Sequence, residues 1–193
     1  MAKKLESTFI NMVAVLFIVT ALAALALGSV YTATKGPIEV AKAAKLKEAI
    51  AYVVPPYDTY NTIEVMPEKG KDSLTFYQAI KDGELVGTAV KTYTDNGFGG
   101  RVSIMVGFKP DGTIINTAVL EHKETPGLGD KMDKSKSDFT EQFKGKNPAD
   151  FKLEVSKDGG DVDAITAATI SSRAFCDAVL RAYTTFEKEG GER

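Results

Sequence analysis

Four hydroxyl side chains gather in one short stretch near the C-terminus. Thr166, Thr169, Ser171 and Ser172 lie within residues 163–172, directly before an amphipathic helical pattern. Backbone N–H groups in the first turn of a helix have no partner within the helix, and the aligned peptide dipoles add partial positive charge there. A phosphate group is stabilised at such a position. Serine and threonine are also good helix N-caps, so this stretch alone favours simple capping.

The segment Glu124-Thr125-Pro126-Gly127-Leu128-Gly129 is the second stretch with chemical potential. Proline restricts one turn, and the two glycines allow backbone conformations denied to other residues. A stiff loop of this kind can present Thr125 and Leu128 to a ligand. Taken in isolation, the segment is more typical of an ordinary tight connection.

Composition excludes several classes of site and partner. The formal net charge is −2, which gives no basic footprint for nucleic acid. Cys176 is the only cysteine and His122 the only histidine, so neither a disulfide nor a self-contained zinc or iron–sulfur site is expected. We predict no metal site, and Cys176 is expected to be a packed thiol. Redox chemistry would therefore need an organic cofactor or a partner's metal.

An apolar segment near the N-terminus predicts a membrane helix. Residues 7–34 are 28 consecutive positions without a charge. About 20 apolar residues are enough to cross a bilayer as a helix, and the twelve large aliphatic and phenylalanine residues here favour insertion by about 5 kcal/mol. The apolar core is longer than that of a signal peptide, although Ala24-Leu25-Ala26 resembles a cleavage site. We therefore expect an uncleaved anchor.

Helical and irregular segments follow the anchor. Gly36-Pro37 is expected to break the membrane helix. A second helix is then predicted over residues 38–54, ended by Pro55-Pro56. Residues 57–72 show no clear period and are expected to form a loop.

The following segment is rich in predicted strands. Alternating patterns predict strands at residues 73–81, 84–92, 101–109 and 113–121. Asp82-Gly83 and Pro110-Asp111-Gly112 are the turns expected within each pair. Further patterns predict a short helix at 134–143, a strand at 151–155 and a terminal helix at about 169–187. The fold class is α+β: an antiparallel sheet of four or five strands with packed helices, preceded by one transmembrane helix.

Three segments together resemble the FMN-binding domain family. Thr166-Ala167-Ala168-Thr169, preceded by Asp163, is similar to the flavinylation motif of these domains, Asp-Gly-x-Ser/Thr-Gly-Ala-Thr. Residues 124–129 are similar to their ETPGLG segment, and residues 97–100 to their glycine loop. With the N-terminal helix, the resemblance covers most of the chain. It is greatest to the G subunits of Rnf complexes, which are ion-translocating ferredoxin:NAD⁺ oxidoreductases, and the C subunits of Na⁺-translocating NADH:quinone reductases are related.

The resemblance implies a cofactor and its site. FMN would be attached through a phosphoester to Thr169 by a separate flavin transferase that consumes FAD. The remaining implied cofactor-binding residues are Asp163, Thr166, Ala168, Ser171, Ser172, Glu124, Thr125, Gly127, Leu128, Gly129, Gly99 and Gly100. The sequence departs from the family pattern at Ala164 and Ala167, where glycine is usual. Alanine disfavours positive φ by about 1 kcal/mol or more, so the turn must differ or tolerate strain.

The resemblance also implies a role and a location. The protein would be a membrane-anchored electron-transfer subunit that relays electrons between ferredoxin- and NAD-linked subunits, with no catalytic residue and no turnover of its own. We expect an anchor over residues 1–34, a connecting helix and loop over 35–72, and a covalent-FMN-binding domain over 73–193 on the outer face of the cytoplasmic membrane. Lysines on both sides of the anchor leave its orientation open. The alternatives are a subunit of the related quinone reductase and a non-redox exported binding domain.

Overall fold

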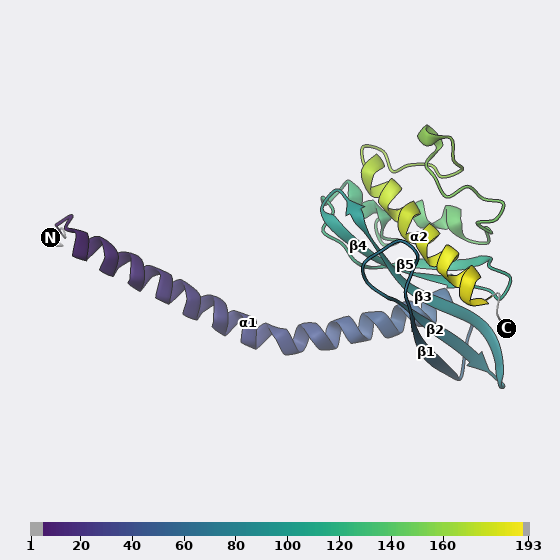
Figure 1. Ribbon diagram of the computed structural model, residues 1–193, viewed down its shortest axis with the longest axis horizontal. Helices are drawn as coiled ribbons and strands as arrows, with labels where there is room; N and C mark the ends of the chain where they lie inside the picture. Colours follow the sequence, from purple (N-terminus) through teal and green to yellow (C-terminus); the bar gives the residue numbers. More distant parts are fainter. Residues whose placement is uncertain (1–5, 191–193) are drawn as a thin grey trace. The chain divides into compact units, whose positions relative to one another are not determined.

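The computed structural model describes residues 6–190 (Figure 1). The chain divides into two compact units, one ending at Ala44 and the other beginning at Lys45. The first contains most of a long helix. The second contains the sheet, the remaining helices and all residues of the predicted cofactor site.

Helix α1 spans Phe9–Val53 without interruption, so the prediction of a break at Gly36-Pro37 is wrong. Proline has a backbone φ compatible with a helix, but inside one it removes a hydrogen bond and crowds the carbonyl four residues earlier, which costs about 3 kcal/mol. The alanine- and lysine-rich sequence after Pro37 strongly favours helix and continues it to Val53, where Pro55 follows. In the described chain, α1 is the one helix long and apolar enough to cross a membrane.

A five-stranded antiparallel sheet forms the centre of the second unit, in the order β1-β2-β3-β4-β5. Its strands are β1 (Thr59–Val65), β2 (Leu74–Lys81), β3 (Glu84–Gly97), β4 (Gly100–Phe108) and β5 (Ile114–Glu121). The four predicted strands are confirmed, and β3 extends five residues beyond its predicted end. This extension carries the sheet to the glycine loop, so the sheet determines where that loop lies.

Strand β1 corrects the prediction that residues 57–72 form only a loop. Its side chains are mostly exposed, because it is an edge strand of the sheet and pairs with β2. An edge strand with little burial shows a weak hydrophobic period. The pairing of Thr59 through Val65 with β2 therefore decides its conformation, and sequence pattern does not.

Both faces of the sheet are covered, each by a separate apolar core. The end of α1, including Ile50 and Val53, packs with Tyr77, Ala89 and Met105 on one face. Helix α2 (Thr169–Gly190) covers the other face (Figure 1). Successive residues of a strand point to opposite faces, so each inner strand contributes to both cores.

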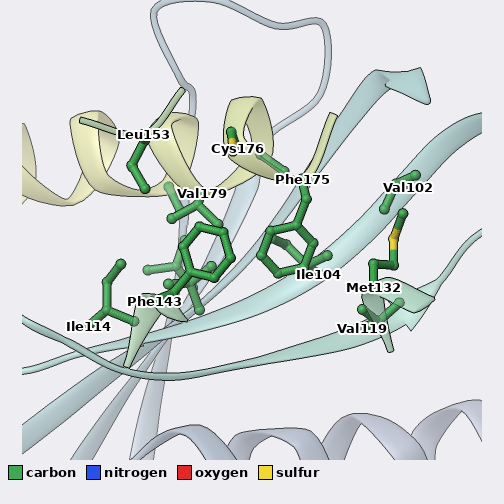
Figure 2. Close-up of a cluster of buried hydrophobic side chains, with 14 of the residues drawn as sticks. Val102, Ile104, Ile114, Val119, Met132, Phe143, Leu153, Phe175, Cys176 and Val179 are labelled. Carbon is green, nitrogen blue, oxygen red and sulfur yellow. The ribbon is translucent and has the colours of Figure 1, made fainter. Parts of the chain in front are cut away.

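The larger core lies between α2 and the sheet (Figure 2). Phe175 of α2 packs against Phe143, with ring centroids 5.0 Å apart, and against Phe139 at 5.3 Å. Cys176 is buried here, which confirms a packed thiol, and burial raises its pKa to about 12. The thiol therefore stays neutral at physiological pH.

Two further predictions between β5 and α2 need correction. Phe139 and Phe143 are both in the core, but their helix is a 3₁₀ turn, Phe139–Phe143, rather than a helix from residue 134. The segment 151–155 is no strand, although Leu153 and Val155 alternate into the core. Its backbone is satisfied by local bonds, such as those from the amides of Asp161 and Val162, so alternation here reflects burial without a neighbouring strand.

Candidate functional site

A cavity of about 330 Å³ lies where three segments of the second unit meet. They are the turn between β3 and β4, the loop at residues 124–129 and the start of α2. The residues that line it are Phe98, Glu124, Thr125, Leu128, Gly129, Ala167, Ala168, Thr169, Ile170 and Ser171. Cavities of about 190 and 240 Å³ lie elsewhere, and none of the predicted cofactor-binding residues lines either of them. The three segments that resemble parts of the FMN-binding domain family therefore come together at one cavity.

A tight turn leads into α2 and sets the direction of Thr169. The Ala168 amide donates to the Ile165 carbonyl at 2.9 Å, which closes a β-turn over Thr166 and Ala167. Ala167 has φ of 63°, the left-handed value that the third residue of a type II turn requires. The turn therefore keeps the shape that glycine usually supplies, with strain at Ala167.

Ser172 holds this turn against the helix. Its hydroxyl donates to the Ala168 carbonyl at 3.1 Å and accepts from the Ile165 amide at 2.9 Å. Ser172 is fully buried, so both capacities of the hydroxyl are used within the protein. Its geometry is that of a side chain that positions the turn.

The first turn of α2 presents open backbone amides. The first helical hydrogen bond runs from the Ser172 amide to the Ala168 carbonyl at 3.0 Å. The amides of Thr169, Ile170 and Ser171 precede it and belong to the positions that lack a partner within a helix. Ala168 stands at the capping position, and alanine has no side-chain oxygen to occupy these amides.

The loop at residues 124–129 is folded tightly against α2. The Leu128 amide donates to the Thr125 carbonyl at 3.1 Å, and Gly127 has φ of 77°. A Cβ at Gly129 would lie 2.5 Å from the Ser171 hydroxyl and 2.7 Å from a carboxylate oxygen of Glu124. Only glycine allows the loop this close to the helix.

The turn between β3 and β4 forms the third wall. Its Gly99 amide donates to Glu124 Oε1 at 2.9 Å. A Cβ at Gly99 would fall on the backbone carbonyl of Lys123, so the two segments are in direct backbone contact. Phe98, at the tip, is 69% exposed and lines the cavity at its rim.

A charged cluster fixes the base of this turn. Arg101 donates to Asp95 at 2.7 Å and to Asp72 at 2.6 Å. The hydrogen bond from Arg101 holds the pKa of Asp95 below its ordinary value. The guanidinium also lies 4.3 Å from the ring centroid of Tyr93, so the side chains of β3 and β4 are linked at the base of this turn.

Some of the predicted site residues line the cavity, and others do not. Thr169, Ala168, Ser171, Glu124, Thr125, Leu128 and Gly129 line it. Asp163, Thr166, Ser172, Gly127, Gly99 and Gly100 do not. Asp163 instead accepts a hydrogen bond from Ser156 at 3.1 Å, and its amide donates to Gln142 at 2.8 Å, so it braces the approach to the turn.

Three lining residues were not among the predicted site residues: Phe98, Ala167 and Ile170. Two of them carry a signal in the sequence. Phe98 is an aromatic residue among glycines, which is unusual in a solvated turn. Ile170 is a large apolar residue outside the apolar stripe of α2, and in the structure it is 48% exposed.

Comparison with known proteins assigns the domain that contains this site. Residues 97–184 match the family described as the FMN-binding domain. The chain is 38% identical over 169 residues to the G subunit of the ion-translocating oxidoreductase complex of Erwinia tasmaniensis, covering 82% of this chain and 80% of the relative. The same-named proteins of Vibrio atlanticus and Escherichia coli are 38% and 37% identical over 77% and 74% of this chain, and 76% and 75% of their own lengths. The chain belongs to the G-subunit family of ion-translocating oxidoreductase complexes.

The residues present fit the FMN of this family. The rim of the cavity is apolar, with Phe98, Leu128 and Ile170 all more than 40% exposed, which suits a flat aromatic ring. The open amides of α2 suit a phosphate. Glu124 is the one charged side chain among the described lining residues, so a phosphate here would depend on backbone amides and the helix dipole.

We predict that Ala167→Gly stabilises the protein by about 0.5–1 kcal/mol, because the relieved left-handed strain of about 1–2 kcal/mol exceeds the cost of about 0.5–1 kcal/mol that the greater freedom of glycine in the unfolded chain carries. Urea unfolding of the full chain in detergent measures the change. Ala164→Gly is the matched control: its φ is not positive, so glycine there should lower stability by about 0.5–1 kcal/mol through its greater freedom in the unfolded chain. Equal effects of both substitutions would contradict strain at Ala167.

Proposed function

We propose that the protein carries FMN covalently, through a phosphoester to Thr169, as the flavoprotein subunit of an ion-translocating oxidoreductase complex. The observation that carries the proposal is the place of Thr169. It is the first residue of α2, lies half-buried on the cavity wall, and stands beside the open amides of the first helical turn. When bound, the flavin supplies the capacity to accept and release electrons.

The neighbouring hydroxyls support Thr169 as the acceptor over themselves. Ser171 is 2% exposed and donates its hydroxyl to Glu124. Ser172 is fully buried and engaged with the turn. Thr166 is exposed but does not line the cavity. Thr169 alone among the four combines a place on the cavity wall with a hydroxyl that is neither buried nor engaged with a neighbouring side chain.

The attachment reaction is an exchange at phosphorus. The Thr169 oxygen would form the new ester bond to the FMN phosphorus of FAD, the pyrophosphate bond would break, and AMP would leave with its phosphate and the threonine proton. A separate flavin transferase would catalyse this step. In our proposal, Asp163 and Thr166 belong to the surface that the transferase recognises, since both are exposed beside the turn.

The complex supplies the partners of the flavin. The relatives are subunits by name, which supports assembly of this chain with other membrane subunits. The proposed role is to relay electrons between ferredoxin- and NAD-linked subunits while the complex moves ions. The chain would turn over no substrate alone. Its cavity would hold the cofactor, and the rim of that cavity is open. A subunit of the related Na⁺-translocating quinone reductase is the nearest alternative in mechanism.

A mass spectrum tests the attachment directly. The full chain is co-expressed with a flavin transferase, digested, and the peptide containing Thr169 is weighed. The expected mass exceeds that of the unmodified peptide by FMN less one water. An unmodified peptide from material made with active transferase would end the proposal and favour the non-redox exported domain.

The domain is proposed to lie outside the cytoplasmic membrane, anchored by α1. We predict that a cysteine at the exposed Glu84, in a Cys176→Ala background, reacts with a membrane-impermeant thiol reagent in spheroplasts. The matched control is Lys4→Cys, which precedes the anchor and should react only after lysis. The reverse pattern would place the flavin domain in the cytoplasm.

A further inference from the structure

Glu124 is a buried acidic side chain whose carboxylate accepts hydrogen bonds from two walls of the cavity. It is 5% exposed, and no lysine, arginine or histidine of the described residues forms an ion pair with it. A buried carboxylate is costly unless hydrogen bonds compensate for lost water. Its retention at this place therefore needs a reason within the site.

The two oxygens of Glu124 each bind a different wall. Oε1 accepts from the Gly99 amide at 2.9 Å, and Oε2 accepts from the Ser171 hydroxyl. The Glu124 amide donates to His122 Nδ1 at 3.1 Å, which fixes the backbone from which the side chain extends. One side chain thus connects the turn between β3 and β4 to the first turn of α2.

The glycines on both sides leave room for this carboxylate and nothing larger. A Cβ at Gly97 would lie 2.7 Å from Oε1, and a Cβ at Gly129 would lie 2.7 Å from Oε2. The carboxylate is therefore enclosed by backbone from two loops. Such close packing transmits the position of one wall to the other.

Phe98 depends on this connection for its place. It follows Gly97 and precedes Gly99, and with 69% of its surface exposed it has little packing of its own. The hydrogen bond from the adjacent Gly99 amide to Glu124 joins this tip to the helix that carries Thr169, because the same carboxylate accepts from Ser171.

We propose that Glu124 is a positioning residue that holds Phe98 opposite Thr169, so that Phe98 forms the aromatic wall against the ring of the attached flavin. The proposal rests on covalent FMN at Thr169. In this proposal Phe98 contacts the flavin. Glu124 does not contact the flavin itself but acts through the turn that carries Phe98.

Visible-region circular dichroism tests this, because a flavin gains such a signal from a fixed asymmetric environment. The full chain is co-expressed with the transferase and purified in detergent. Glu124→Ala removes both acceptors and should lose the signal while FMN stays attached, since Ser172 holds the attachment turn separately. Glu124→Gln should keep it, because the amide oxygen can accept from Gly99 and the amide nitrogen can face the Ser171 oxygen.

A double-mutant comparison distinguishes positioning from simple stabilisation. Phe98→Ala should lose the signal to the same extent as Glu124→Ala, and the double variant should lose no more, because both changes remove one wall. Phe98→Ala should leave the unfolding midpoint unchanged, as expected for an exposed side chain. Glu84→Gln, an exposed glutamate outside the cavity, is the control and should change neither quantity.

Several results would overturn the assignment. A wild-type signal in Glu124→Ala, with only a lower unfolding midpoint, would show a structural role alone. Loss of signal in Glu124→Gln equal to that in Glu124→Ala would exclude action through these hydrogen bonds. If Glu124→Ala does not fold, Ser171→Ala and Glu124→Asp replace it. Ser171→Ala removes the hydrogen bond to Oε2, and Glu124→Asp shortens the side chain that connects the two walls. Unchanged circular dichroism of the flavin in both variants would refute the proposal. A wild-type chain without flavin would instead remove the function proposed above.

Discussion

Replacing Thr169 by alanine is expected to abolish covalent flavin completely while the protein stays folded. The substitution removes the oxygen that would carry the phosphoester. It leaves the helix cap unchanged, because Ala168 occupies that position. A surface or half-buried change of this kind alters the free energy of unfolding by about 0.5 kcal/mol or less. Ultraviolet fluorescence of the denatured protein on a gel measures attachment, with transferase co-expressed.

Three further substitutions serve as controls for this result. Thr169→Ser keeps a hydroxyl at the same place and should retain the fluorescent band. Thr166→Ala and Ser171→Ala remove the neighbouring hydroxyls and should retain it as well, with at most a reduced yield. A fluorescent band on the Thr169→Ala chain would move the attachment to one of these neighbours.

The second large effect is expected at Phe175, on the buried side of the same helix. Phe175→Ala should lower the free energy of unfolding by about 3–5 kcal/mol, because it opens a cavity in the core of the flavin domain. The ring is fully buried and packs against the rings of Phe139 and Phe143. Figure 2 shows it beside Phe143 in the core under α2. Urea unfolding of the full chain in detergent, followed by circular dichroism, measures the loss.

Leu180→Ala is the matched control on the same helix. Leu180 is 43% exposed, so truncation there should cost well below half of the effect at Phe175. Equal losses at the two positions would mean that α2 is not held to the sheet by this core. The position of Thr169 would then need another explanation.

Local chemistry was enough to predict the elements that carry their own signals. Asp82-Gly83 lies between two alternating segments, and the hairpin β2–β3 forms there. Phe175, Val179 and Phe186 recur at helical spacing, and α2 buries all three. These patterns report burial on one face and turn conformation, which short segments encode by themselves.

Elements that depend on neighbours were predicted less well. β1 has weak alternation and exists because β2 offers a free edge to pair with. Residues 151–155 alternate strongly, yet within the described chain they form only an isolated parallel bridge between Val155 and Val162, so they pack without a ladder. Pro37 signals a break, but the alanine- and lysine-rich sequence that follows it outweighs the lost hydrogen bond and the crowding by the proline ring.

The chemical character of the site could be recognised in the order of residues, because hydroxyls before a helix, glycine-containing loops and an apolar anchor are all local features. Which of these groups face the cavity depends on how distant segments pack. Thr169 remains on the cavity wall, whereas packing buries Ser172 and engages its hydroxyl with the turn before α2. The Glu124 bridge joins residues 25 and 47 positions away, and no local pattern encodes contacts over such separations.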